Sequence, residues 1–124
     1  MATPETALQV LIVEDIDAMR LFLEELLSPV PGLQISGTAA NGWEAQLAVS
    51  RHRPDIVLLD EVLPDGDGSV ALSEFHVLSG LPVIIITGTG DDATREACLG
   101  SGAVGYLEKP FSISNLLTMI RLFT

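Results

Sequence analysis

Hydrophobic residues along the chain are grouped in short runs that alternate with amphipathic stretches. Residues 10–13 and 56–59 are uninterrupted apolar runs, which leave no polar face and predict buried strands. Residues 82–87 form the most β-branched run and predict a central buried strand. Weaker runs at 33–38 and 104–107 complete a set of five predicted strands.

The amphipathic stretches predict one helix after each strand. Residues 16–27 carry apolar side chains such as Met19 and Phe22 at helical spacing, and this pattern stops at Ser28-Pro29. The other helices are predicted at about 42–52, 69–78, 92–99 and 113–124. Strands that are apolar on both faces need helices on both faces. The alternation therefore predicts an α/β fold, a doubly wound parallel sheet of five strands with five helices.

The composition indicates one globular domain. A chain of 124 residues has the size of a single domain, and we expect residues 1–124 to form one domain without an effector domain. Its 48% hydrophobic content and mean hydropathy of +0.43 favour a packed core over disorder. The apolar runs are only as long as strands, and the first residues lack a signal-peptide pattern. The single cysteine, Cys98, is typical of a reducing compartment, so we predict a cytoplasmic protein.

The charge balance is strongly acidic and narrows the choice of partners. The chain has 17 Asp and Glu against 6 Lys and Arg, which gives a formal net charge of −11. Such a surface repels phosphate backbones and anionic lipids, so direct binding to nucleic acid or to a membrane is not expected. The only lysine of the chain is Lys109, directly after the last predicted strand.

Chemically active side chains follow four of the predicted strands. Glu14-Asp15 and Asp60 follow the first and third strands, Thr87 ends the fourth, and Lys109 follows the fifth. Ligands of doubly wound sheets bind at this carboxyl edge. Clustered carboxylates repel one another, and Mg2+ favours a few carboxylates together with a phosphate oxygen. Because a lysine and a hydroxyl can hold the remaining phosphoryl oxygens, the pattern predicts a site for Mg2+ and phosphate.

Nucleotide binding is not indicated. The chain has no G-x-x-x-x-G-K-[ST] phosphate loop and no G-x-G-x-x-G after the first strand. The phosphoryl group must then reach the site on another molecule, and a carboxylate can itself accept it as an aspartyl phosphate.

These residues together resemble the receiver domains of bacterial two-component response regulators. The acidic pair Glu14-Asp15 follows the first strand, and Asp60 begins the sequence D-E-V-L-P-D-G-D-G, which is similar to the D-x-x-[LM]-P-x-x-[DN]-G loop of that family. Thr87, Tyr106 and Lys109-Pro110 follow in the family's order. The resemblance extends from Gln9 to the last helix. It implies a flavodoxin-like sheet of strand order 2-1-3-4-5.

The resemblance also implies the roles of the site residues. Asp60 would accept a phosphoryl group from a histidine kinase or a phosphotransfer protein. Asp15, Asp60 and the backbone carbonyl of Val62 would bind Mg2+, and Glu14 would act largely through water. Thr87 and Lys109 would hold the phosphoryl group, and Tyr106 would be the aromatic switch. The only catalysis implied is self-phosphorylation and self-dephosphorylation, so no metabolic enzyme activity is expected.

The output surface implied by the resemblance is the face formed by the fourth helix, the fifth strand and the fifth helix. It would bind a downstream protein, an effector domain of the same protein, or a second copy in a homodimer. In the last helix, a core-facing stripe is predicted at Ile113, Leu116, Leu117, Ile120 and Phe123. Met119 and Leu122 fall off this stripe, and we expect them to contribute to a partner interface.

Two features depart from the common family pattern. Glu61 places a charge directly after the acceptor, and it is expected to point away from the pocket. Gly88 is small and would leave the mouth of the pocket open, which favours fast loss of the phosphate.

Two other function classes are compatible with parts of the pattern. A Mg2+-dependent phosphatase of the haloacid dehalogenase type would use Asp15-Ile16-Asp17 as its D-x-D motif. In those phosphatases, however, the lysine precedes the late Gly-Asp motif, whereas in this chain Lys109 follows Gly90-Asp91. A phosphate-independent interaction module would keep only the fold, and the complete set of acidic residues argues against it.

Overall fold

The computed structural model describes residues 7–60, 80–88, 93, 96, 99–100 and 103–122, and the backbone of two short strands at 62–63 and 66–67. Its strands are β1 (Leu8–Val13), β2 (Leu33–Ala39), β3 (Ile56–Asp60), β4 (Val62–Leu63), β5 (Gly66–Asp67), β6 (Val83–Thr87) and β7 (Gly105–Glu108). Its described helices are α1 (Asp17–Leu27), α2 (Gly42–His52) and α5 (Ile113–Leu122).

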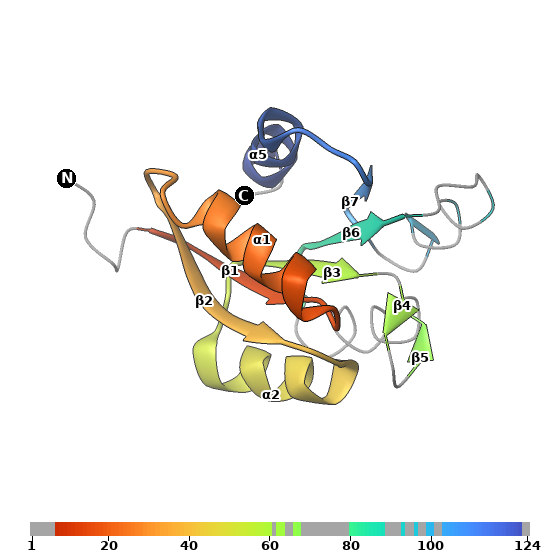
Figure 1. Cartoon of the computed structure of the whole chain (residues 1–124). Helices are drawn as coiled ribbons and strands as arrows, with labels where there is room; N and C mark the ends of the chain where they lie inside the picture. The colour runs from red at the N-terminus through yellow and green to blue at the C-terminus, as the bar shows by residue number, and fades with distance from the viewer. Residues whose placement is uncertain are drawn as a thin grey trace.

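Five parallel strands form one sheet in the order β2-β1-β3-β6-β7 (Figure 1). This is the predicted doubly wound arrangement, because the chain moves outward from β1 in one direction and then returns to the other side through β3. The central strands β3 and β6 are buried along their whole length. Their uninterrupted apolar runs are explained by this position, since each strand has a neighbour on both sides and a layer over each face.

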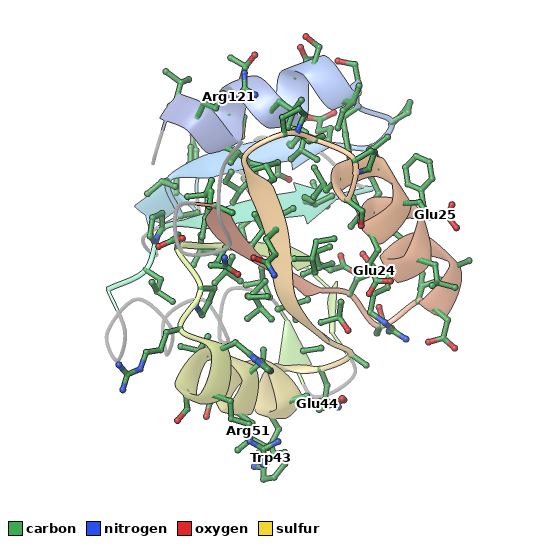
Figure 2. The ribbon with its side chains drawn as sticks, turned by 90° about the vertical axis from the view of Figure 1, so that its left-hand side faces the viewer. Glu24, Glu25, Trp43, Glu44, Arg51 and Arg121 are labelled. Carbon is green, nitrogen blue, oxygen red and sulfur yellow. The ribbon has the colours of Figure 1, made fainter. Side chains whose placement is uncertain are left out.

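Two hydrophobic clusters cover the two faces of the sheet. On one face, Leu23 and Leu27 of α1 and Leu116 and Ile120 of α5 pack against the sheet, and Figure 1 shows these two helices on the same side. On the other face, small residues of α2, including Ala45, pack against β1, β3 and β6. The polar sides of the helices face solvent, and Figure 2 shows Trp43 and Arg51 on the outer side of α2.

The two helices that follow β1 and β2 begin differently. Asn41 is the N-cap of α2, and its side chain accepts a hydrogen bond of 2.8 Å from the backbone N–H of Glu44. The N-cap of α1 is Ile16, which makes no side-chain capping bond.

Most predicted elements are confirmed, and the differences have local causes. Segment 63–68, predicted as a loop, contains part of a small antiparallel pair, in which Val62 lies opposite Asp67 and Leu63 opposite Gly66. Phe22 is on the periodic face of α1 but is 51% exposed, because the sheet reaches only the side of the helix that carries Leu23 and Leu27. The predicted helices at 69–78 and 92–99 lie wholly or largely outside the described residues, as do Glu61 and Phe123.

Met119 differs from the expectation that it adds apolar surface. It is partly buried and packs against the same cluster as Leu116 and Ile120, whereas Leu122 is 71% exposed. The reason is Gly105 on β7, where a Cβ atom would lie 2.6 Å from the Met119 Sδ. The missing side chain of this glycine leaves room for Met119, which widens the buried face of α5.

We expect Gly105→Ala to destabilise the fold by about 1–2 kcal/mol, because the new methyl group overpacks the space that Met119 fills. Urea unfolding measures the change. Met119→Ala in the Gly105→Ala background should recover part of the lost stability, since the shorter side chain removes the clash. If the two changes are simply additive, the close approach of Met119 does not determine the packing of α5.

Candidate functional site

The predicted site residues come together at the carboxyl edge of the sheet. Glu14 and Asp15 follow β1, Asp60 ends β3, Thr87 ends β6 and Lys109 follows β7. These four strands are consecutive neighbours in the sheet, so their ends lie along one edge. The backbone N–H of Lys109 donates to the carbonyl of Thr87 at 2.7 Å, which extends the pairing of β6 and β7 to the lysine itself.

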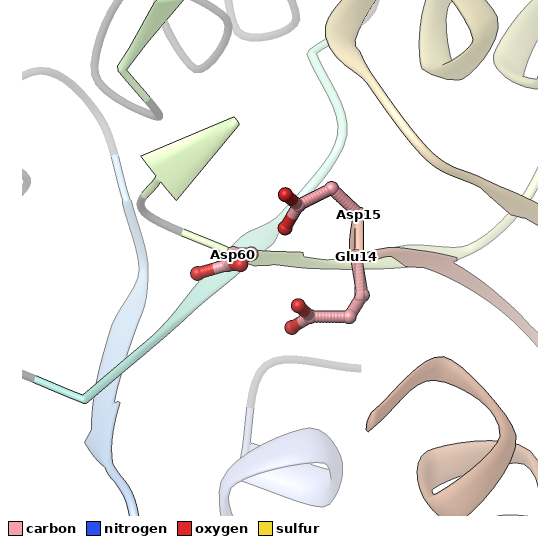
Figure 3. Close-up of side chains that lie close together, drawn as sticks. All are labelled: Glu14, Asp15 and Asp60. Atoms are coloured by element: carbon pink, nitrogen blue, oxygen red, sulfur yellow. The ribbon is translucent and has the colours of Figure 1, made fainter. Parts of the chain in front are cut away.

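The centre of the edge is an acidic cluster of Glu14, Asp15 and Asp60 (Figure 3). One carboxylate oxygen of each residue lies within 4.8 Å of the others. Glu14 is 1% exposed and Asp60 is 7% exposed, so two of the three carboxylates have lost most of their water. Three negative charges at this separation repel one another strongly in a poorly solvated place.

A hard divalent cation fits this set of donors. The three residues offer only carboxylate oxygens, the ligand type that Mg2+ binds, and their spacing allows one ion to contact or approach all three. They leave coordination positions open, which Mg2+ fills with water or with a phosphate oxygen. The group could therefore hold a metal ion.

Glu14 connects the acidic cluster to the lysine. Its Oε2 lies 3.4 Å from the Lys109 Nζ, and its Oε1 accepts a hydrogen bond of 3.3 Å from the backbone N–H of Ile16. The carboxylate is buried, whereas the lysine side chain is 21% exposed. This ion pair holds the ammonium group of Lys109 at the acidic cluster. The resemblance to receiver domains assigned Lys109 to the phosphoryl group and did not imply this contact with Glu14.

Thr87 and Tyr106 lie on the neighbouring strands β6 and β7. Thr87 is buried and is paired with Glu108 in the sheet register. Tyr106 is partly buried and packs against the hydrophobic cluster on the α2 face. Val62, whose carbonyl is a predicted Mg2+ ligand, lies in β4 shortly after Asp60. Gly88 is exposed, and a Cβ atom there would meet no atom within 4 Å.

Arg20 is a residue of this region that the sequence reasoning did not identify. Its Nη1 donates a hydrogen bond of 2.8 Å to the backbone carbonyl of Glu14, and its Nη2 pairs with the carboxylate of Asp17. Helical spacing places Arg20 one turn after Ile16 and Asp17, so its reach toward the end of β1 could have been anticipated. The bond to a backbone carbonyl, however, has no signature in the sequence.

A profile of the response regulator receiver domain matches residues 10–121, which is nearly the whole chain. The chain belongs to this family. The flavodoxin-like fold and the acidic cluster agree with this assignment.

Curated relatives share the receiver region and are longer proteins. The chain is 38% identical over 114 residues to the transcriptional regulatory protein PdtaR of Mycobacterium tuberculosis, a match that covers 92% of this chain and 55% of that protein. It is 35% identical over 118 residues to the KDP operon transcriptional regulatory protein KdpE of Escherichia coli, covering 90% of this chain and 49% of that protein. The chain thus spans about half the length of these relatives.

Solved structures with the same fold include receiver domains from two other bacteria. The response regulator domain of Thermotoga maritima CheB superposes with a TM-score of 0.88 at 26% identity, covering 94% of this chain and 96% of that one. The CheY of Borrelia burgdorferi in the CheX-CheY-BeF3-Mg2+ complex superposes with a TM-score of 0.87 at 28% identity, covering 99% of both chains. In the part of this chain that the structure describes, no helix is long and apolar enough to cross a membrane.

Proposed function

We propose that this receiver domain is a phosphorylation-controlled switch in which Asp60 accepts the phosphoryl group. The observation that carries the proposal is the position of Asp60, a 7% exposed carboxylate that ends a central strand within the acidic cluster. The ammonium group of Lys109, held by Glu14, and the buried Thr87 lie at the ends of the adjoining strands. This set combines a nucleophilic carboxylate, a cation site and donors for phosphoryl oxygens.

The proposed reaction transfers a phosphoryl group from a phosphohistidine of the donor protein. An oxygen of Asp60 forms the new P–O bond while the P–N bond to the histidine breaks. The electron pair of the broken bond stays on the imidazole, which takes up a proton from solvent. Self-dephosphorylation is a separate step, in which water attacks the phosphorus and the bond between phosphorus and the Asp60 oxygen breaks. Asp60 then leaves as the carboxylate, and inorganic phosphate and a proton are released to solvent.

Charge compensation is the main task of the surrounding residues. Mg2+, when bound, would neutralise the carboxylates and the phosphoryl oxygens, and Asp15, Asp60 and the Val62 carbonyl are proposed to hold it, with Glu14 acting largely through water. Lys109 would exchange its contact with Glu14 for a phosphoryl oxygen, and the Thr87 hydroxyl would donate to another. The CheY relative in complex with BeF3 and Mg2+ supports this assignment by analogy.

The conformational response is proposed to start at Thr87 and Tyr106. Movement of Thr87 toward the phosphoryl group frees space near the neighbouring strand, and Tyr106 turns further inward as the aromatic switch. The test uses beryllofluoride with Mg2+, which mimics a phosphoryl group on a carboxylate. Amide resonances of β7 and α5 should shift on addition to the wild type and stay unchanged in Asp60→Asn. Shifts confined to residues 14–16 and 60 would contradict a switch through β7.

The proposed partners follow from this chemistry. A histidine kinase or a phosphotransfer protein would donate the phosphoryl group, and a downstream protein or an effector domain of the same polypeptide would read the result. The longer transcriptional regulators among the relatives support an effector of some kind. Direct nucleic-acid binding is not proposed for this domain, because of its net charge of −11.

The phosphatase alternative receives no support from Asp17, its second acidic residue. The side chain of Asp17 is 84% exposed and is paired with Arg20 at the start of α1. The acidic cluster within 4.8 Å instead contains Glu14, Asp15 and Asp60. A carboxylate that pairs with an arginine in solvent is poorly suited to act as a general acid or base for a reaction at Asp15.

We expect the exposed end of α5 to mediate self-association of the phosphorylated form. Leu107, Asn115, Thr118, Met119 and Leu122 line an open hollow of about 310 Å³ between β7 and α5. Leu122→Asp should weaken dimerisation of the beryllofluoride form by tenfold or more, because a carboxylate replaces apolar surface that the dimer buries. Sedimentation velocity measures the dissociation constant of the dimer. The matched control is Leu21→Asp, which changes another exposed leucine, on α1. Equal dissociation constants for the wild type and Leu122→Asp would contradict this interface.

A further inference from the structure

The connection between β1 and α1 carries two of the three clustered acids, and it is held by Arg20. The Nη1 group of Arg20 donates to the carbonyl oxygen of Glu14 at 2.8 Å, and its Nη2 group pairs with Asp17. The carbonyl of Glu14 belongs to the peptide group that joins Glu14 to Asp15. One side chain of α1 therefore holds the backbone at the point where the acidic residues leave the sheet.

Glu14 is also contacted by the residue that precedes α1. The N-cap residue of α1, Ile16, makes no side-chain capping bond, whereas Asn41 caps α2. The backbone N–H of Ile16 donates instead to the Glu14 Oε1 at 3.3 Å. Glu14 thus accepts a hydrogen bond on its side-chain carboxylate from Ile16 and another on its backbone carbonyl from Arg20. Residues at the start of α1 therefore orient both the side chain and the backbone carbonyl of Glu14.

Asp15 depends on this backbone for its position. Within the part of the chain that the structure describes, no hydrogen bond to the Asp15 carboxylate is found, and its oxygen nevertheless lies within 4.8 Å of oxygens of Glu14 and Asp60. The direction of the Asp15 side chain is therefore set by the two peptide groups around it. The first of these is the one that Arg20 binds.

We infer that Arg20 is a positioning residue for the cation site, acting through the Glu14–Asp15 peptide group. The inference rests on the proposed function, because it assigns Arg20 to the Mg2+ site proposed there. The charge of Arg20 acts in the opposite sense, since a cation near the acids repels Mg2+. That effect is small because Asp17 compensates the guanidinium charge. Loss of the bond to Glu14 therefore outweighs loss of the charge.

The experiment is a calorimetric titration of Mg2+ into the full chain and into Arg20→Lys and Arg20→Met. Both variants should raise the Kd for Mg2+ about tenfold. Neither keeps a guanidinium group, whose Nη1 and Nη2 contact the Glu14 carbonyl and Asp17 at the same time. Arg121→Met, on α5, is the control for loss of one arginine, and Figure 2 shows Arg121 far from α1. A wild-type Kd in Arg20→Lys with tighter binding in Arg20→Met would overturn the inference, because it would show a pure charge effect.

Asp17→Asn separates the two contacts of Arg20. It weakens the ion pair but leaves the guanidinium free to donate to the Glu14 carbonyl. The Kd for Mg2+ should rise by no more than about threefold, because the guanidinium charge is no longer compensated but the bond to the carbonyl is kept. A tenfold change in Asp17→Asn would overturn the inference in favour of the ion pair. This variant keeps Arg20, so it also provides a test if Arg20→Met does not fold.

A second readout distinguishes positioning of the metal site from a general loss of structure. In phosphorylation by acetyl phosphate, Arg20→Lys should raise the Mg2+ concentration for half-maximal rate about tenfold and leave the rate at saturating Mg2+ within about twofold. An equal fall in rate at every Mg2+ concentration would overturn the inference.

If the wild type binds no Mg2+, the proposed function fails and the inference with it. If the wild type binds and the variants bind equally well, only the inference fails.

Discussion

Asp60→Asn is expected to be more stable than the wild type without divalent cations, although it cannot accept a phosphoryl group. Asparagine keeps the shape of the side chain but removes one of three negative charges within 4.8 Å of one another. Because Asp60 is only 7% exposed, water screens this repulsion poorly. We expect a gain on the order of 1–2 kcal/mol in the free energy of unfolding, measured by urea denaturation in EDTA.

Glu25→Gln is the matched control for this prediction. It changes the net charge by the same amount, but Glu25 is exposed on α1, where Figure 2 shows it pointing into solvent. Its stability should remain within about 0.5 kcal/mol of the wild type. Saturating Mg2+ should reduce the advantage of Asp60→Asn, because cation binding stabilises the wild type more. A variant less stable than the wild type in EDTA would show that the acids are not strained by their proximity.

Lys109→Met is expected to affect both stability and phosphorylation. The lysine Nζ lies 3.4 Å from the Oε2 of Glu14, and that carboxylate is 1% exposed. Removing the ammonium group leaves a buried charge with less compensation, which should cost about 2 kcal/mol of unfolding free energy in EDTA. It also removes a donor for the phosphoryl group, so the rate of phosphorylation by acetyl phosphate should fall about 100-fold.

Two further variants separate these effects. Glu14→Gln in the Lys109→Met background should recover most of the lost stability, since the buried charge is then gone, but it should not recover the phosphorylation rate. Lys109→Arg keeps the positive charge and should lose less stability than Lys109→Met. If Lys109→Met is phosphorylated at the wild-type rate, the proposed role of the lysine at the phosphoryl group is wrong.

The core of the fold was predictable because its signal is local. Residues 10–13, 56–59 and 83–86 are continuous apolar runs, and each is a buried strand of the sheet. Helix α2 was predicted from its amphipathic pattern at about 42–52, and these are its observed bounds. The paired strands β4 and β5 were missed, because two-residue strands are shorter than any periodic pattern and Pro64-Asp65-Gly66 is typical of a turn.

Features that depend on three-dimensional fit were less predictable. A helical wheel places Met119 off the core stripe, but only the close approach to Gly105 shows that β7 has room for it. The acidic cluster was predicted from the ends of two strands, because a parallel sheet brings such ends to one edge. Two contacts were not predicted from the sequence, the Glu14–Lys109 ion pair and the hydrogen bond from Arg20 to the Glu14 carbonyl. Both depend on the direction in which side chains leave that edge of the sheet.

The central claim, that Asp60 is the phosphoacceptor, is tested most directly by the mass of the intact protein after incubation with acetyl phosphate. The wild type should gain a single phosphoryl group in the presence of Mg2+ and none in EDTA, and Asp60→Asn should gain none under either condition. The same adduct on Asp60→Asn would place the phosphoryl group on another residue. A folded wild type that gains no adduct and binds no beryllofluoride would contradict the claim and favour an interaction module that works without phosphate.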